Sequence, residues 1–133
     1  MKSFTDASGY SKEQTLKLLS LKNLVNIVKV GGTSEHGQFF SKIDPQNVHI
    51  NDFLVKSLDA GGYNAITHKV GLNGTSYFTG VTVIHELTHY GRHWNGLPQF
   101  IGVYEAGQVF ETNAFGSIQA TAGANGNAIK NGW

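Results

Sequence analysis

Cysteine is absent from the 133-residue chain, which excludes disulfides, cysteine nucleophiles and thiolate metal sites together. Any metal ion must therefore be held by histidine and carboxylate side chains. A chain without cysteine fits the cytosol and an exported location equally well. The first ten residues, MKSFTDASGY, also lack the apolar core of a secretory signal. The sequence leaves the location open, with secretion or delivery as part of a larger protein as one alternative.

Charge and long apolar runs are scarce as well. Charged residues make up 14% of the chain, the formal net charge is +1, and the lysines are scattered singly. No basic stripe indicates a nucleic-acid partner, and no apolar run approaches the length of a membrane span. The sequence thus predicts neither a nucleic-acid nor a membrane partner.

The length suits one domain with a modest core, and the 17 glycines indicate many loops. No internal repeat or domain boundary is visible, so we expect a single domain over residues 1–133. The abrupt start and the final residues, NGNAIKNGW, resemble trimmed edges. We therefore expect this domain to have been excised from a longer protein.

The order of elements indicates an α+β fold, because a few strands are followed by two helices. Ser11 and Gln14 have the spacing of a capping box, which predicts a first helix from residue 11. Strands are expected at 25–30, 47–50 and 64–70, whereas 53–58 fits a strand or a helix. Helices are expected from residue 79 or 80 and over 101–115, with a loose tail after Gly116.

The sequence HELTH, from His85 to His89, matches the pattern H-E-x-x-H inside a helical segment. Helix residues four apart lie one turn apart on nearly the same face, so both imidazoles can reach one ion. Glu86 points about 100° away from His85, which lets it flank a metal without binding it. There it can take a proton from a metal-activated water and pass it to a leaving amine. The alternative interpretation is a surface helix with stray histidines or a site that has lost its metal.

A catalytic zinc of this type needs a third protein ligand, and elimination restricts the choice. No aspartate lies after Asp59 and no histidine after His93, so the later carboxylates are Glu105 and Glu111. The metzincin pattern fails because Asn95 stands where its third histidine would be, and peptide deformylases need a cysteine ligand. A glutamate from the following helix, as in gluzincins, is left.

Helix-face positions favour Glu111 over Glu105 as this ligand. At about 100° per residue, Glu111 shares a half-apolar face with Phe115 and Gly107, and the glycine would let this helix approach the motif helix closely. Glu105 lies on a more polar face with Gln108. A carboxylate on an apolar face needs a partner, and zinc would be such a partner for Glu111.

Three further residues are candidates for a supporting role. Arg92 and His93 lie near the histidine face, so either could polarise the substrate carbonyl or hold Glu111 in place, although a structural role is favoured for His93. Glu105, if it is not a ligand, is a surface charge or bonds to one of the histidines. A donor to the transition state is also expected, and spacing does not choose among Tyr63, His68, Tyr77 and Tyr104.

The block HELTHYGRHWNGL, with FETNAFG after it, resembles the zincin metallopeptidases. Within them it is most similar to the short bacterial toxin and effector metallopeptidase domains found at the C-terminal ends of polymorphic, repeat-containing toxins. Clostridial neurotoxin light chains show a similar pattern, but their gap between the motif and the third ligand is longer. The resemblance covers roughly residues 79 to 117.

This resemblance implies a minimal zincin-like fold, with a small mixed sheet packed on the HExxH helix and a second, ligand-bearing helix. It matches His85, His89 and Glu111 to the Zn²⁺ ligands. It matches Glu86 to the general base. The implied substrate is a peptide or protein, and a larger parent chain and an immunity protein are further implied partners.

We therefore predict a zinc-dependent metallopeptidase that hydrolyses peptide bonds through a metal-activated water, with Glu86 as general base. The strand over 64–70 is expected to bind the substrate as an added strand. Two alternatives stand beside this prediction: a catalytically inactive zincin-fold binding domain, and a zinc hydrolase that acts on a non-peptide substrate. The intact Glu86 argues against the first, since a pure binder needs no base.

Overall fold

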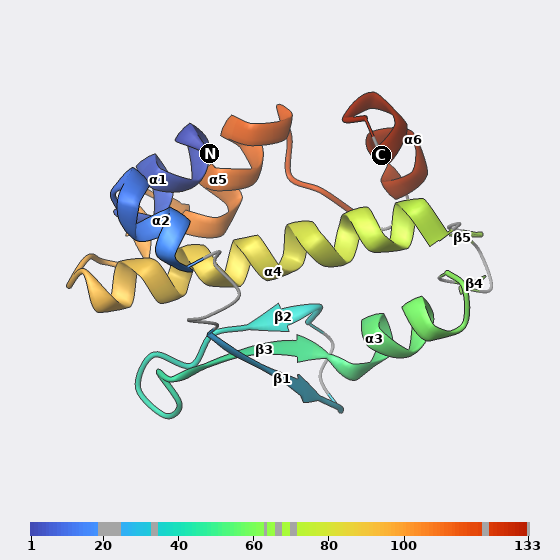
Figure 1. Ribbon diagram of the computed structural model, residues 1–133, viewed down its shortest axis with the longest axis horizontal. Coiled ribbons are helices and arrows are strands. Elements are labelled where there is room, and N and C mark those ends of the chain that lie inside the picture. Colours follow the sequence, from blue (N-terminus) through green and yellow to red (C-terminus); the bar gives the residue numbers. More distant parts are fainter. Residues whose placement is uncertain are drawn as a thin grey trace.

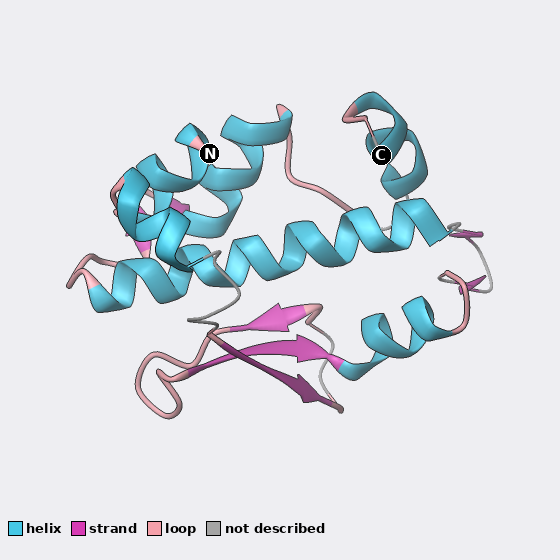
Figure 2. Cartoon of the chain, in the orientation of Figure 1, coloured by secondary structure: helices cyan, strands magenta, loops and turns pink. Residues whose placement is uncertain are grey.

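The computed structural model describes residues 1–18, 25–32, 35–62, 64–65, 68–69, 72–120 and 123–132. The longest element is helix α4 (Leu72–Trp94), which lies between a group of helices on one side and a small sheet on the other (Figure 1). This mixture of helices and short strands confirms the predicted α+β fold (Figure 2). Among the described helices, none combines the length and the apolar character needed to cross a membrane.

The sheet consists of β1 (Asn26–Val30), β2 (Gly37–Gln38) and β3 (Asn47–Asn51). β3 is central, with β1 parallel to it and β2 antiparallel, so the sheet is mixed. Val48 and Ile50 of β3 are buried in the core, against α4. The strand order leaves β2 as an edge strand, and it runs alongside α4 (Figure 1).

Helix α3 (Asp52–Asp59) follows β3 without a loop. Its start is set by Asn51, whose side chain accepts a hydrogen bond from the backbone N–H of Phe53 at 3.0 Å. Leu54 on its inner face is buried in the core. The segment 53–58, which fitted a strand or a helix, is therefore helical.

On the other side of α4 lie α1 (Lys2–Ser8), α5 (Ala106–Phe115) and α6 (Ala124–Lys130). Phe4 and Phe110 meet edge to face with ring centroids 6.2 Å apart, which fixes α1 against α5. Helices α1 and α6 are not expected from the sequence, and the prediction of a loose tail after Gly116 is wrong. Ala128 of α6 is fully buried, so the small side chains that suggested a loose tail serve close packing.

Helix α2 (Lys12–Leu18) begins where the sequence predicted. The backbone N–H of Ser11 donates to Gln14 at 2.7 Å, and the backbone N–H of Gln14 donates to the Ser11 hydroxyl at 3.1 Å. These reciprocal bonds confirm the capping box.

Two hairpins of short strands complete the fold. β4 (Asn64–Ala65) pairs with β5 (His68–Lys69) near the N-terminal end of α4, within the stretch expected as one strand (Figure 1). β6 (Phe100–Ile101) pairs with β7 (Tyr104–Glu105), where the sequence predicted the start of a helix. The turn between them uses Gly102 with a φ of 64°, a backbone conformation that favours glycine. Helix α5 consequently begins at Ala106, after Glu105 rather than before it.

Candidate metal centre

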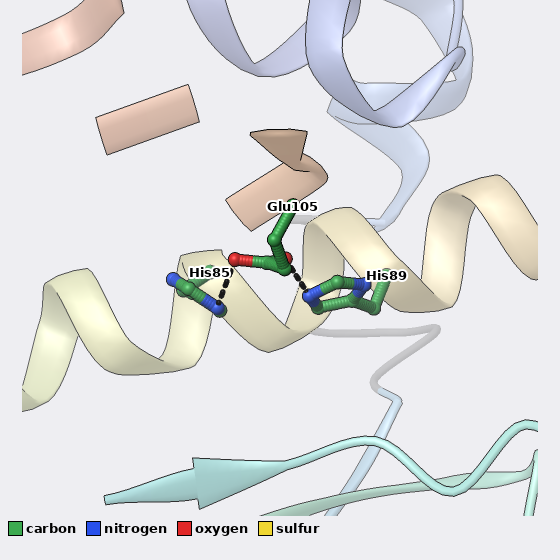
Figure 3. Close-up of side chains that lie close together, drawn as sticks. All are labelled: His85, His89 and Glu105. Atoms are coloured by element: carbon green, nitrogen blue, oxygen red, sulfur yellow. Dashed lines mark ion pairs between the residues drawn. The ribbon is translucent and has the colours of Figure 1, made fainter. Parts of the chain in front are cut away.

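The middle of α4 presents both motif histidines on one face. His85 and His89 lie one turn apart, with ring centroids separated by 5.4 Å. Val81 and Leu87 are buried in the core, and they orient the helix so that the two imidazoles face a cleft. The Nε2 atoms of both rings point towards the carboxylate of Glu105 (Figure 3).

Glu105 is held at the N-terminus of α5 as its capping residue. Its carboxylate accepts hydrogen bonds from the backbone N–H groups of Gly107 at 2.6 Å and Gln108 at 2.9 Å. The positive end of the helix dipole further favours a carboxylate here. One oxygen lies 3.3 Å from Nε2 of His85, and the other contacts Nε2 of His89.

His85, His89 and Glu105 each offer one ligand atom, and these atoms all lie within 4.8 Å of one another. Among the described residues, this is the one group of three histidine or acidic side chains with such a spacing. Two imidazole nitrogens and a carboxylate oxygen are a donor set that zinc accepts. The arrangement could therefore hold a metal ion.

Glu111, which the sequence favoured as the third ligand, lies on the other side of His85. Its Oε1 lies 2.6 Å from Nδ1 of that ring, and its Oε2 accepts the backbone N–H of Gln119 at 2.5 Å. Glu111 is buried, as expected, but an imidazole and a backbone amide satisfy its carboxylate. The expected close approach of Gly107 is present, since a Cβ there would lie 2.3 Å from the His85 ring.

His89 is supported in the same way by Gln99, a residue the sequence analysis missed. Oε1 of Gln99 lies 2.6 Å from Nδ1 of His89. An acceptor at Nδ1 keeps the proton on that nitrogen and leaves the Nε2 lone pair available to a metal. Gln99 stands in an irregular loop, so no periodic pattern could have indicated its partner.

The Glu86 side chain lies against strand β2, and only 5% of its surface is exposed. A Cβ on Gly37 would lie 2.9 Å from its Oε1, so the Glu86 carboxylate lies directly against the strand. Burial raises the pKa of Glu86 to about 7, against a lowering by the two histidines and with a smaller increase from Glu105 and Glu111.

The side chains of His85, Glu105 and Glu111 form a cluster of interacting groups. Burial alone would lower the pKa of His85, but hydrogen bonds with Glu105 and Glu111, together with the charges of Glu105 and Glu86, raise it to about 10. Burial would raise the pKa of Glu105, but hydrogen bonds from His85 and His89 outweigh it and hold the pKa well below its usual value. In the absence of a metal, the proton on His85 supplies positive charge that faces the carboxylate.

The cluster opens into a cleft of about 470 Å³ between β2 on one side and Gln99, Glu105 and Gln108 on the other. A second hollow of about 230 Å³ continues along α4 towards its N-terminus and shares Gly37, His85 and Glu86 with the first. Of the segment 64–70, which was expected to bind substrate, the structure describes β4 and β5, and these lie away from the motif, at the N-terminal end of α4 (Figure 1). Strand β2 is the one that borders the cleft.

Arg92 and His93 make structural contacts. The Arg92 guanidinium is buried and donates to three backbone carbonyls, those of Ala7 at 2.8 Å, Phe100 at 3.5 Å and Pro98. It therefore fixes the loop that carries Gln99 and does not face the cleft. The His93 ring packs against Phe39 and Trp94, with centroids 5.7 and 5.1 Å away.

Of the four candidates for a transition-state donor, the two whose side chains the structure describes, Tyr77 and Tyr104, do not line the cleft. Tyr77 is buried and donates a hydrogen bond to Gln119 at 3.0 Å. Tyr104 is exposed on β7, and it does not line the cleft beside β2. Tyr63 and the side chain of His68 lie outside the described residues.

A family model described as metallopeptidase toxin 3 matches residues 1–116, which is most of the chain. The chain belongs to the metallopeptidase toxin 3 family. This result confirms the resemblance to toxin-type metallopeptidase domains, and the matched region contains His85, Glu86, His89 and Glu105. Neither the curated proteins nor the solved structures gave a match.

A metallopeptidase toxin 3 domain implies a metal, and the residues present fit one. Both Nδ1 atoms already have acceptors, which directs both Nε2 atoms towards the carboxylate of Glu105. That carboxylate is fixed by two backbone N–H groups, so its orientation needs no change. Thus each of these three side chains is held in place by other protein groups, independently of any ion.

Proposed function

We propose that this domain is a zinc-dependent metallopeptidase in which His85, His89 and Glu105 hold the ion. The observation that carries the proposal is the convergence of their three ligand atoms within 4.8 Å, beside a buried Glu86. We choose Glu105 as the third ligand in place of the predicted Glu111, because Glu105 faces both Nε2 atoms whereas Glu111 contacts Nδ1 of one ring. Glu111 and Gln99 orient the two imidazoles.

Glu86 acts as the general base. A bound zinc ion supplies a Lewis acid that makes water more acidic and a peptide carbonyl more electrophilic. Glu86 accepts the proton of the attacking water and delivers it to the amine that leaves. Its pKa of about 7 in the metal-free protein suits both transfers near neutral pH. A cation nearby lowers that pKa and favours the carboxylate form that starts the reaction.

The substrate is a peptide or protein segment that lies in extended form along β2. This strand has a free edge in the described sheet, because β3 pairs with its other side. It borders the same cleft as His85, Glu86 and His89. An extended peptide added to this edge would pass over the reacting groups, and its main-chain hydrogen bonds would not depend on its sequence.

Two other functions are compatible with the same residues: a zinc hydrolase for a non-peptide substrate, and a binding domain without catalysis. The bordering edge strand favours a peptide over the first. The burial of Glu86 against β2 favours catalysis over the second, because a buried carboxylate with no role beyond binding carries a desolvation cost. As a toxin-type domain it would act within a larger parent chain and be neutralised by an immunity protein.

Metal analysis combined with protease profiling tests the proposal. The purified protein should contain about one zinc ion per chain and should cleave members of a mixed peptide library. Glu86→Gln should retain the zinc and abolish cleavage. Zinc without cleavage of any peptide would favour the non-peptide or binding function, and full cleavage by Glu86→Gln would exclude Glu86 as the base.

A further inference from the structure

Strand β2 passes over the catalytic helix at Gly37, and the contact leaves no room for a side chain. A Cβ built on Gly37 would lie 2.8 Å from Cγ and 2.9 Å from Oε1 of Glu86, and 2.9 Å from Cγ2 of Thr82. These distances are shorter than van der Waals contact. The φ of Gly37 is not positive, so its backbone conformation does not itself require glycine. Space is what requires it.

The two helix residues under Gly37 differ in how they could respond to a larger residue. Thr82 is fixed because its hydroxyl donates to the backbone carbonyl of Phe78 at 3.0 Å. The Glu86 side chain rotates about more bonds, so it would be the group that moves. Any such movement carries its carboxylate away from the position it occupies between the strand and the cleft.

We propose that Gly37 is a positioning residue for the general base: the volume left by its missing side chain is the volume that holds the Glu86 carboxylate in one orientation beside the ligand histidines. A side chain at position 37 would lie against Glu86, so Gly37 acts through Glu86 in this role. The proposal rests on the proposed function for its catalytic consequence. The close contact between Gly37 and Glu86 can be tested without measuring activity.

The first test substitutes Gly37→Ala in the zinc-loaded chain. Activity is measured on a quenched fluorescent peptide chosen from a mixed library for cleavage by the wild-type protein. We expect kcat to fall between about 10-fold and 100-fold, because general bases are sensitive to displacements of this size, while KM and zinc content stay close to wild type. Gly31→Ala is the matched control, since a Cβ there meets nothing within 4 Å. Unchanged kcat in Gly37→Ala would overturn the proposal.

Thr82→Ser distinguishes a displacement of Glu86 from a change in the spacing between β2 and α4. This substitution removes Cγ2 but keeps the hydroxyl that bonds to Phe78. If Glu86 is the group displaced, Gly37→Ala lowers kcat as much in the Thr82→Ser background as in wild type. Full recovery of kcat in the double variant would assign the effect to Thr82 and overturn the proposal.

A stability cycle tests the contact without using activity. Gly37→Ala should lower the midpoint of denaturant unfolding of the metal-free protein, and it should lower it less in a Glu86→Ala background, which lacks both Cγ and Oε1. An equal loss in both backgrounds would show that Gly37 does not act through Glu86. If the wild-type protein cleaves no peptide, the proposed function fails, but this cycle still decides whether Gly37 fixes Glu86.

Discussion

Oε1 of Glu111 lies 2.6 Å from Nδ1 of His85, on the side of the ring opposite the proposed metal position. The carboxylate accepts the Nδ1 proton, so it keeps the Nε2 lone pair available and makes the imidazole a stronger ligand. Glu111→Gln retains an acceptor of the same size but loses the charge. We expect it to bind zinc about 10- to 100-fold more weakly than wild type while still reaching one ion per chain at saturation.

Glu105→Gln is the isosteric counterpart at the other glutamate. We expect this variant to lose zinc at concentrations that saturate Glu111→Gln, because a neutral amide replaces the one anionic ligand. The amide oxygen can still accept a backbone N–H at the start of α5, so the helix should remain intact. Elemental analysis of both variants, with circular dichroism as the folding control, decides between the two glutamates. Zinc retained in Glu105→Gln and lost in Glu111→Gln would restore the choice made from the sequence.

The motif could be predicted from the sequence because its geometry is local. The four-residue spacing of His85 and His89 on a helix determines that their rings share a face, whatever surrounds them. The choice between Glu105 and Glu111 as the proposed third ligand does not depend on local geometry alone. It depends on where α5 begins, and the hairpin around Gly102 delays that start until after Glu105. A carboxylate at the end of a strand and before a helix was the available signal for an N-terminal cap.

Gln99 and Gly37 could not be identified from the sequence, because each meets its partner through tertiary packing. Gln99 reaches His89 from a loop that Arg92 ties down by hydrogen bonds to backbone carbonyls. Gly37 meets Glu86 from a two-residue strand. Neither position carries a periodic pattern or a motif, so only the arrangement of strand, loop and helix in space reveals its role.

Gly107→Ala should disturb the ligand side of the site. Its Cβ would lie 2.3 Å from Nε2 of His85, in a buried position between two packed helices. We expect a loss of about 1–3 kcal/mol in the free energy of unfolding, as is usual for overpacking, and weaker zinc binding because Nε2 is the proposed ligand atom. Gly126→Ala in α6 is the matched control, since a Cβ there meets no atom within 4 Å. Denaturant unfolding and zinc titration of both variants provide the comparison. If Gly107→Ala had the same stability and zinc affinity as Gly126→Ala, the prediction would be wrong.

Arg92→Met should lower both stability and metal affinity. The substitution keeps much of the buried side-chain volume but leaves the carbonyls of Ala7, Pro98 and Phe100 without this donor. We expect the free energy of unfolding to fall by about 2 kcal/mol, because buried carbonyls are left unsatisfied. The loop of Gln99 also loses its anchor, so His89 should bind zinc less tightly. Lys130→Met, at an exposed position, is the control and should change neither the stability nor the zinc affinity. If Arg92→Met bound zinc as tightly as wild type, Arg92 would have no influence on the metal centre.

The stability of the metal-free protein should fall as the pH rises from about 5 to about 9. The folded pKa of Glu86 is raised from 4.5 to about 7, so the folded state binds more protons than the unfolded state over that interval. The folded pKa of His85 is raised from 6.5 to about 10, so its contribution is complete below 6.5 and is lost as the pH rises towards 10. Both effects have the same sign. The lowered pKa of Glu105 acts only in acid, where its contribution is lost as the pH falls below 4.5.

Thermal unfolding in the presence of a chelator, measured at intervals between pH 5 and pH 9, checks this dependence. Glu86→Gln removes the carboxyl group that titrates first, so its stability should change little up to about pH 6.5 and fall only above it. Added zinc should stabilise the wild-type protein more strongly at higher pH, because an ion at this position must displace the proton held on Nε2. A metal-free wild-type protein that becomes more stable between pH 5 and pH 7 would mean that Glu86 is not buried beside β2 as the structure places it.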